Sequence, residues 1–283
     1  MQSLRQIKNR IRGIENTKKV TAAMELISVA KLNRIDKLLF NLRPYSLKLD
    51  AILNNLAASA AAFRHPLLDD RPKKGKIGLC ILAADSGLCG AYNINILSLA
   101  EDFIREHGSA KVSVVAIGKK AFTYFKRRSY EILNSYMGLN GRYSQKICDE
   151  INQYLINLYL SGKVDEVHVA YTHFENAMVH KPVLKKFLNI TPGEGIKSEY
   201  IFEPEKEKIF AGLIQRYVQV RFRLMLIEAF TSEHAARPVV MKQATDNAED
   251  LLHNLNLVKN KVRQANITQD IMEIISSAEA LKG

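Results

Sequence analysis

The stretch DSGLCG at residues 85–90 is the part of the sequence whose residue types are best suited to chemistry. It follows an apolar run that ends at Leu82, and a helix-like run comes after it. Glycine-rich turns between a strand and a helix often bind phosphate through backbone N–H groups. The spacing of Gly87 and Gly90 fits neither GxxxxGK[ST] nor GxGxxG. The sequence therefore favours a tight structural corner, and nucleotide binding by a small α/β enzyme is the weaker interpretation.

Histidine and cysteine are the other residue types that could form a metal or catalytic site. His168, His173 and His180 lie 5 and 7 residues apart and no HExxH motif is present, so the spacing does not favour a metal site. The three cysteines, Cys80, Cys89 and Cys148, form no CxxC pair, which is typical of reduced thiols. No Ser/His/Asp arrangement stands out. We expect no metal, no cofactor and no catalytic residue in this chain.

The chain is basic, with 41 Lys and Arg against 29 Asp and Glu and a net charge of +12. This balance predicts an acidic partner, which could be nucleic acid, an anionic membrane surface or an acidic protein. Many of the cations lie in the first part of the chain: Arg5, Lys8, Arg10, Arg12, Lys18, Lys19, Lys31 and Arg34. A solvated helix face is the simplest explanation of such a run. A nucleic-acid-binding coiled-coil protein is the alternative that composition alone supports.

Both ends of the chain have helical periodicity. Leu4, Ile7, Ile11 and Ile14 recur at a spacing of three and four residues, and the stripe resumes from Leu32 to Leu56. A similar stripe runs from Leu213 towards the C-terminus, where Pro238 is the only strong helix breaker after residue 205. We expect one long helix that bends within a turn of His234, in preference to a new helix that starts at the proline.

The lengths of these helices predict the architecture. Helices over about 50 and about 75 residues would be ~75 and ~110 Å long. A compact protein of this size is only ~50 Å across. The terminal helices must therefore project from the body, and we expect them to pair as an antiparallel two-helix coiled coil. The last turns contain Ile267, Ile271, Met272, Ile274 and Ile275, which predicts that another protein covers the tip.

The middle of the chain alternates short β-branched runs with helical segments. Strands are predicted at 77–83, 112–117 and 164–171, with helices at 95–107, 119–128 and 144–160 between them. This order indicates a Rossmann-like α/β domain with a mostly parallel sheet, and 183–190 is predicted as an antiparallel edge strand. The sequence thus predicts an N-terminal shaft helix at 1–60, a linker at 61–76, a globular α/β domain at 77–204 and a C-terminal shaft helix at 205–283.

Motifs at both ends and in the middle resemble those of a known family. The start, IKNRIRGIENTKKVT followed by Ala23-Met24-Glu25, resembles the N-terminal motif of the gamma subunit of F-type ATP synthases. MKQATDNA at 241–248 and NKVRQANIT at 260–268 resemble its C-terminal helix, and DSGLCG resembles its central loop. The family usually has arginine at the position of Ser86 and methionine at that of Pro238, and these two departures affect local contacts.

The resemblance implies a central-stalk rotor subunit that couples proton flow through a membrane ring to ATP synthesis, regulates ATPase activity and is not itself catalytic. The implied partners are three alpha and three beta subunits of the catalytic head, the epsilon subunit and the membrane c-ring, and no nucleic acid. The implied location is peripheral, on the cytoplasmic face of a bacterial inner membrane or the matrix face in an organelle. Carried over by position, contacts with the head fall on Met24, Arg263, Gln264, Thr268 and Asp270. Contacts of the docking loop fall on Asp85, Gly87, Leu88, Cys89 and Gly90.

Overall fold

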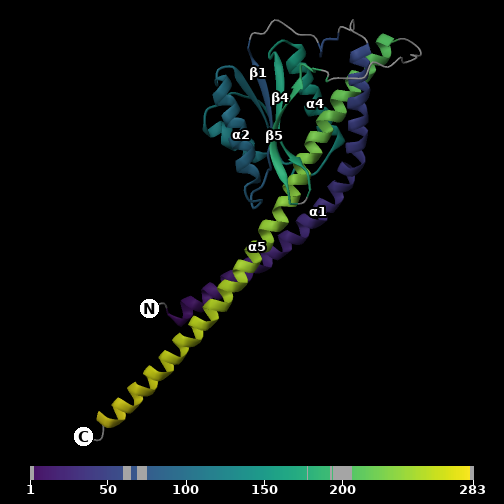
Figure 1. Cartoon of the computed structure of the whole chain (residues 1–283). Coiled ribbons are helices and arrows are strands. Elements are labelled where there is room, and N and C mark those ends of the chain that lie inside the picture. Colours follow the sequence, from purple (N-terminus) through teal and green to yellow (C-terminus); the bar gives the residue numbers. More distant parts are fainter. Residues whose placement is uncertain are drawn as a thin grey trace. The chain divides into compact units, whose positions relative to one another are not determined.

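The computed structural model describes residues 3–59, 65–68, 75–176, 178–191, 193 and 206–280. The chain divides into two compact units, residues 1–28 with 238–283 and residues 29–237. The elements are α1 (Leu4–Ser59), β1 (Ile77–Leu82), α2 (Tyr92–His107), β2 (Val112–Ile117), α3 (Lys119–Arg127), β3 (Ile132–Tyr136), α4 (Gln145–Leu160), β4 (Glu166–Phe174), β5 (His180–Leu188) and α5 (Lys206–Ala280) (Figure 1). Most of the predicted linkers, at 60–64, 69–74 and 194–205, lies outside the described residues.

The sheet belongs to the unit of residues 29–237 and has the strand order β3-β2-β1-β4-β5. β1 pairs in parallel with β2 and β4, and β2 pairs in parallel with β3. β5 is antiparallel to β4. The mostly parallel sheet and its antiparallel edge strand, which the sequence predicted, are therefore confirmed.

Helices cover both faces of this sheet. Because successive strand residues point to opposite faces, Leu79 and Ile81 of β1 join a cluster with residues of α2 and α3. Cys80 and Leu82 of the same strand join a larger cluster with residues of α4, α1 and α5. Figure 1 shows α2 and α4 on opposite sides of the strands. The β1 positions are buried on both faces, which explains the continuous apolar run in the sequence.

Strand β3 was missed in the sequence prediction. Its sequence ILNSY contains Asn134 and Ser135, which are uncommon in strands, and all five residues are only half-buried at the end of the sheet. The bounds of three predicted elements also differ by more than one residue: α2 begins at Tyr92, β4 spans Glu166–Phe174 and β5 spans His180–Leu188. Gly162 caps the C-terminus of α4 with a φ of +70°, and its N–H donates to Tyr159 O at 3.1 Å.

The long helices are antiparallel where they meet within each unit. In the first unit, the hydroxyls of Thr21 and Thr245 lie 2.7 Å apart, and Lys18 Nζ lies 3.2 Å from Glu249 Oε2. In the second unit, Arg43 Nη2 lies 2.8 Å from Glu228 Oε1, and the Arg216 guanidinium contacts Tyr45. In each unit, moving forward along α1 corresponds to moving backward along α5, so the predicted antiparallel pairing is confirmed.

Helix α5 continues across Pro238. The proline has no N–H to donate to the His234 carbonyl, yet helical structure is present on both sides of it, so a new helix does not start there. The bend expected near His234 and the domain boundaries stay predictions. Among the described residues, no helix is both long and apolar enough to cross a bilayer.

Candidate functional site

Asp85 fixes three segments at the carboxyl edge of the sheet. Its Oδ1 accepts the N–H groups of Lys119, at the start of α3, and of Gly138, at 2.9 and 3.0 Å. Its Oδ2 accepts the Asn140 N–H at 2.7 Å. An acceptor-only carboxylate is suited to this role because each oxygen can take more than one donor. Asp85 thus connects the end of β1 to the start of α3 and to the loop after β3.

The glycines of the 85–90 loop differ in what the backbone requires of them. Gly90 has a φ of +58°, a conformation that favours glycine. A Cβ at Gly87 would meet only the Lys120 side chain at 3.8 Å, so the backbone would accept a larger residue there. Leu88 has a φ of +60° although it carries a Cβ, and its side chain is 58% exposed. The corner therefore holds a large apolar side chain in solvent with a strained backbone.

Backbone donors on either side of the 85–90 turn are engaged by the chain itself. The Ala84 N–H donates to Asn93 Oδ1 at 2.9 Å, and the Lys120 N–H donates to Ala84 O at 3.1 Å. Asp85 takes the Lys119 N–H, as described above. These bonds fix the turn as a structural corner, and its glycine spacing fits neither phosphate-binding motif.

Cys89 and Tyr92 anchor the loop in the protein interior. Both are buried and pack together with Ala84 and Ala236. Asn93 Nδ2 donates to Cys89 Sγ at 3.1 Å, and the Tyr92 hydroxyl donates to Ala229 O at 2.9 Å. Burial raises the pKa of the Cys89 thiol, which keeps it protonated and weakly reactive at neutral pH.

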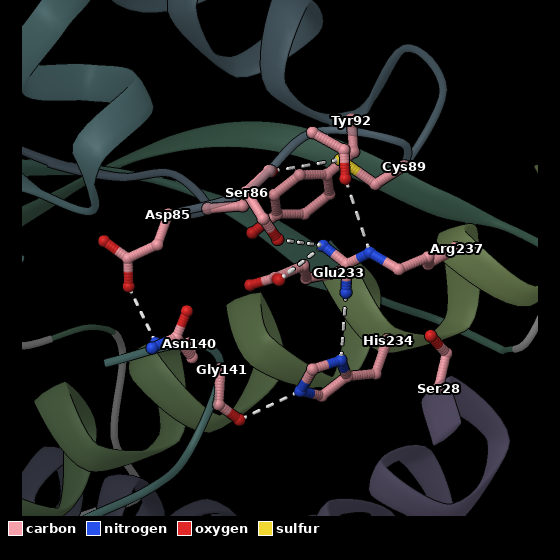
Figure 2. A network of polar contacts seen from close by, with 12 residues as sticks. Ser28, Asp85, Ser86, Cys89, Tyr92, Asn140, Gly141, Glu233, His234 and Arg237 are labelled. Carbon is pink, nitrogen blue, oxygen red and sulfur yellow. Dashed lines mark hydrogen bonds and ion pairs between the residues drawn. The ribbon is translucent and has the colours of Figure 1, made fainter. Parts of the chain in front are cut away.

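Arg237 of α5 ties the loop to the long helix (Figure 2). Its guanidinium donates to Glu233 Oε1 at 2.7 Å and to Ser86 Oγ at 3.1 Å. It also contacts Gly87 O at 3.4 Å and His234 Nδ1 at 3.3 Å. Arg237 is 5% exposed and Glu233 is 1% exposed, so this is a buried ion pair between residues four apart in α5.

His234 completes the network in its neutral form. Its Nε2 lies 3.0 Å from Gly141 O and must carry the proton there, because a carbonyl only accepts. Nδ1 is then an acceptor for the Arg237 guanidinium. Burial lowers the pKa of His234 to about 4. A Cβ at Gly141 would lie 2.3 Å from His234 Nε2, so glycine is required where the two segments meet.

Glu233 holds a carboxylate in an apolar setting. Burial raises its pKa, although the positive charge of Arg237 acts in the opposite direction. Oε1 pairs with Arg237, whereas Oε2 has no hydrogen-bond partner among the described residues. Lys31 of α1 is also near, and its Nζ donates to Asn140 O at 3.3 Å. The cations near Glu233 therefore come from both α1 and α5, and the nearby carboxylate of Asp85 opposes them.

The structure brings the predicted docking residues together on this loop: Asp85, Gly87, Leu88, Cys89 and Gly90. The residues predicted to contact the head lie in the unit formed by residues 1–28 and 238–283. Arg263, Gln264, Thr268 and Asp270 are exposed on α5, and Met24 is half-buried on α1. Arg263 and Gln264 are therefore both available to a partner outside the chain. The described residues include no His/Cys/Asp/Glu group arranged to hold a metal.

The sequence analysis did not predict that Glu233, His234 and Arg237 form one buried cluster. The signal available was FTSEHAARPVV at 230–240, where charged residues spaced by four interrupt an otherwise small and apolar segment. An i,i+4 acid–base pair usually indicates a solvated helix face. Here the small neighbours Ala235 and Ala236 allow close packing, and both are buried.

A His234→Gln variant should reduce the acid sensitivity of folding. Because the pKa of His234 is lowered to about 4 in the folded chain, the unfolded chain binds an extra proton between pH 6.5 and pH 4. Stability therefore falls as the pH drops through this window, by about 2 kcal/mol between pH 7 and pH 5. Glutamine keeps an N–H for Gly141 O but does not titrate. Urea unfolding of the parent and of the variant at pH 7 and at pH 5 measures the difference. Glu233 is present in both chains, so its titration contributes to both. Equal losses of stability in the two chains would contradict this assignment.

The comparisons with known proteins cover the whole chain. A family model described as ATP synthase matches residues 3–281. The ATP synthase gamma chain of Protochlamydia amoebophila is 38% identical over 291 residues, and that of Pelotomaculum thermopropionicum is 37% identical over 286 residues, with 100% of both chains covered in each case.

Solved structures share the fold at lower identity. A chain of the Euglena gracilis mitochondrial ATP synthase (OSCP/F1/c-ring, rotational state 3) has a TM-score of 0.66 and 15% identity, over 98% of this chain and 94% of that one. A chain of the Tetrahymena thermophila mitochondrial ATP synthase central stalk and c-ring has a TM-score of 0.60 and 18% identity, over 80% and 99%. From the full-length match to the family model and to relatives of 37–38% identity, the chain belongs to the ATP synthase gamma chain family.

Proposed function

We propose that this chain is the non-catalytic rotor subunit of an ATP synthase central stalk, which couples proton flow to ATP synthesis in a catalytic head and regulates ATPase activity. The observation that carries the proposal is the apolar tip of α5. The pairing of Thr21 with Thr245 places Leu4 opposite about residue 262, so residues 264–280 of α5 extend beyond the first helical residue of α1. Five large apolar side chains in that segment are 47–68% exposed: Ile267, Ile271, Met272, Ile274 and Ile275.

Such a tip needs cover from other proteins. Exposed apolar surface of this kind marks an interaction site, and a ring of head subunits would bury it. Two further features support the same interpretation. The site residues Arg263, Gln264, Thr268 and Asp270 are exposed on the tip or directly before it, and relatives of similar length carry the name ATP synthase gamma chain. Rotation of an asymmetric shaft would favour a different conformation at each catalytic site through unequal contacts.

Co-purification from native membranes tests this proposal. We expect three copies each of two nucleotide-binding subunits, the alpha and beta subunits, for each copy of this chain, together with an epsilon subunit and the c-ring. The association would place the chain peripherally on the cytoplasmic face of a bacterial inner membrane or the matrix face in an organelle. Tight, salt-sensitive binding to DNA or RNA by a chain that brings down none of these subunits would instead favour the nucleic-acid alternative.

The 85–90 loop has the features of a docking element within this assembly. The loop is held in place by the contacts of Asp85, Cys89 and Arg237 described above. Leu88 is therefore presented on a fixed backbone. Lys119 and Lys120 are exposed at the N-terminus of α3, where positive charge is unfavourable next to the helix dipole. A partner surface with an apolar pocket and nearby carboxylates would satisfy both features.

A Leu88→Asn variant separates docking from folding. Asparagine adopts positive φ more readily than leucine, so the stability of the chain should stay the same or rise by up to about 1 kcal/mol. Loss of the apolar anchor should weaken association with the partner roughly tenfold. Thermal unfolding and subunit retention in the purified complex measure the two effects. Ile94, exposed on α2, offers a matched control, because Ile94→Asn also removes a large apolar side chain. An unchanged complex with Leu88→Asn would remove Leu88 from the docking surface.

A further inference from the structure

The two edges of the sheet are protected to very different degrees. β5, at one edge, contains Lys181, Pro182, Lys185 and Lys186. Lysine and proline are the residues that natural sheets use to stop further strands from pairing. The edge is also contacted from α5, because Arg221 Nη2 donates to Lys186 O at 2.9 Å. β5 is therefore an edge strand that is protected against further pairing.

β3, at the other edge, has neither lysine nor proline. Its residues Ile132–Tyr136 include neither a charge nor a proline, and in the described part of the chain it pairs with β2 alone. Glu131 O accepts from Val114 N and Tyr136 O accepts from Gly118 N, so both are directed at β2. Backbone groups alternate in direction along a parallel strand, but the register of β3 against β2 shifts between Ile132 and Asn134. Counted from Glu131 on one side of the shift and from Tyr136 on the other, the groups of Ile132 and Ser135 are directed away from β2.

One of these outward donors already uses a substitute acceptor. The Ser135 N–H donates to Asn134 Oδ1, the side chain of the preceding residue, at 2.8 Å. The Asn134 carboxamide also donates to the Tyr136 hydroxyl at 3.1 Å. A side chain thus takes the position that a carbonyl of a sixth strand would occupy, which shows that the backbone here presents a donor to an incoming chain.

A groove runs beside this edge. It has a volume of ≈ 410 Å³ and is lined by Phe122 and Lys126 of α3, by Tyr130, and by β3 residues 132–135. Lys126 Nζ lies 5.0 Å from the centroid of the Phe122 ring, so a cation and an apolar surface lie side by side. An edge strand next to a helix-walled groove is the arrangement in which extended peptides add to a sheet.

We propose that β3 accepts an extended, carboxylate-bearing segment of another subunit as a sixth strand, with its side chains in the β3–α3 groove. Charge favours this occupant over a second copy of the chain. α3 contains Lys119, Lys120, Lys126 and Arg127 and no acidic residue. Pairing β3 with itself would bring two such helices together, whereas an acidic strand would neutralise Lys126 as it pairs. The proposal rests on the proposed function, because the partner strand comes from the same assembly.

Amide hydrogen exchange of the purified complex and of the free full-length chain tests this proposal. We expect the Ile132 and Ser135 amides to exchange about 100-fold more slowly in the complex. The Lys186 amide is the matched control, because it lies on the protected β5 edge and the carbonyl of the same residue is directed away from β4 towards Arg221; its exchange should change little. Equal exchange of Ile132 and Ser135 in the two samples would overturn the proposal. If the chain does not co-purify with the other subunits at all, the proposed function fails instead.

A Ser135→Pro variant provides the second test. Proline removes the outward N–H but no bond to β2, and the sheet already accepts Pro182 in β5. We expect the variant to keep its fold and to lose the slow exchange of Ile132 in the complex.

A photo-crosslinking residue at position 134 of the otherwise unchanged chain should form adducts with an acidic segment of one subunit. The same residue at position 185 should not. Adducts to a second copy of this chain, or none, would contradict the assigned occupant.

Discussion

An Arg237→Met variant should lose about 3–5 kcal/mol of folding stability at pH 8, because it leaves the Glu233 carboxylate buried without its cation. Arg237 is 5% exposed and Glu233 1% exposed, so water cannot replace the missing partner. The variant also removes the donor to Ser86 Oγ, which lies 3.1 Å from the guanidinium. Urea unfolding of the full chain, at a concentration where light scattering shows a monomer, measures the loss.

The loss should shrink as the pH falls. Burial already raises the pKa of Glu233 and Arg237 holds it down, so removing the arginine raises this pKa further. A group whose pKa is higher in the folded chain stabilises that chain increasingly as the pH falls towards its unfolded value, near 4.5. The variant therefore gains more from acidification than the parent does. A difference in stability that stays constant from pH 8 to pH 5 would contradict this account.

A double variant, Glu233→Met with Arg237→Met, provides the control. With both charges removed, no unpaired buried group remains, and methionine fills a similar volume. Its stability should lie closer to that of the parent than the stability of the single Arg237→Met variant does. Additive losses would show that Glu233 and Arg237 act independently, contrary to the 2.7 Å contact between them.

Much of the fold follows from local sequence patterns. The long helices α1 and α5 show an apolar stripe at helical spacing, and β1 is a continuous apolar run buried on both faces. β3 could not be predicted in the same way, because ILNSY at a half-buried edge has neither strict alternation nor a full apolar run. Its pairing with β2 depends on the tertiary placement of α3 and of the loop that Asp85 holds.

The candidate site was predictable only in part. The 85–90 loop stood out through its glycines, but the residues that hold it are distant in sequence. Arg237 reaches Ser86 across 151 positions, and Asp85 reaches Asn140 across 55. Single-sequence patterns report neighbours on one element, so Glu233 and Arg237 look like an exposed i,i+4 pair. Their burial arises from packing that the local sequence does not encode.

Changing Arg263 and Gln264 together to alanine should reduce proton-driven ATP synthesis at least about tenfold while the fold is retained, if the proposed function is correct. Both residues are exposed on α5, and alanine is the best helix former, so the folding cost should stay within about 0.5 kcal/mol. The expected functional loss follows from the cations around Arg263, which forms no ion pair with any described residue of its own unit.

Arg263 lines a groove of ≈ 430 Å³ whose other residues are Leu4, Lys8, Ile11, Arg12, Glu15 and Lys259. Four cations therefore meet one carboxylate. Lys8 with Arg12, and Lys259 with Arg263, are also like-charged pairs at i,i+4, which destabilise a helix slightly. Carboxylates on the surrounding head subunits would offset this repulsion, and truncating one member of such a buried charge pair costs 2 kcal/mol or more.

The measurement compares ATP synthesis driven by an imposed proton gradient in membranes that carry parent or variant complexes. Circular dichroism of the purified chain checks that the helix is intact. Arg105→Ala is the matched control, because Arg105 is an exposed cation of the other unit that pairs with Asp102 at 3.5 Å, and such surface pairs contribute little. Synthesis at the parent rate with an intact helix would show that Arg263 and Gln264 do not contact the head. A melted helix would show that their role is structural, because exposed side chains that only contact a partner leave the isolated helix unchanged.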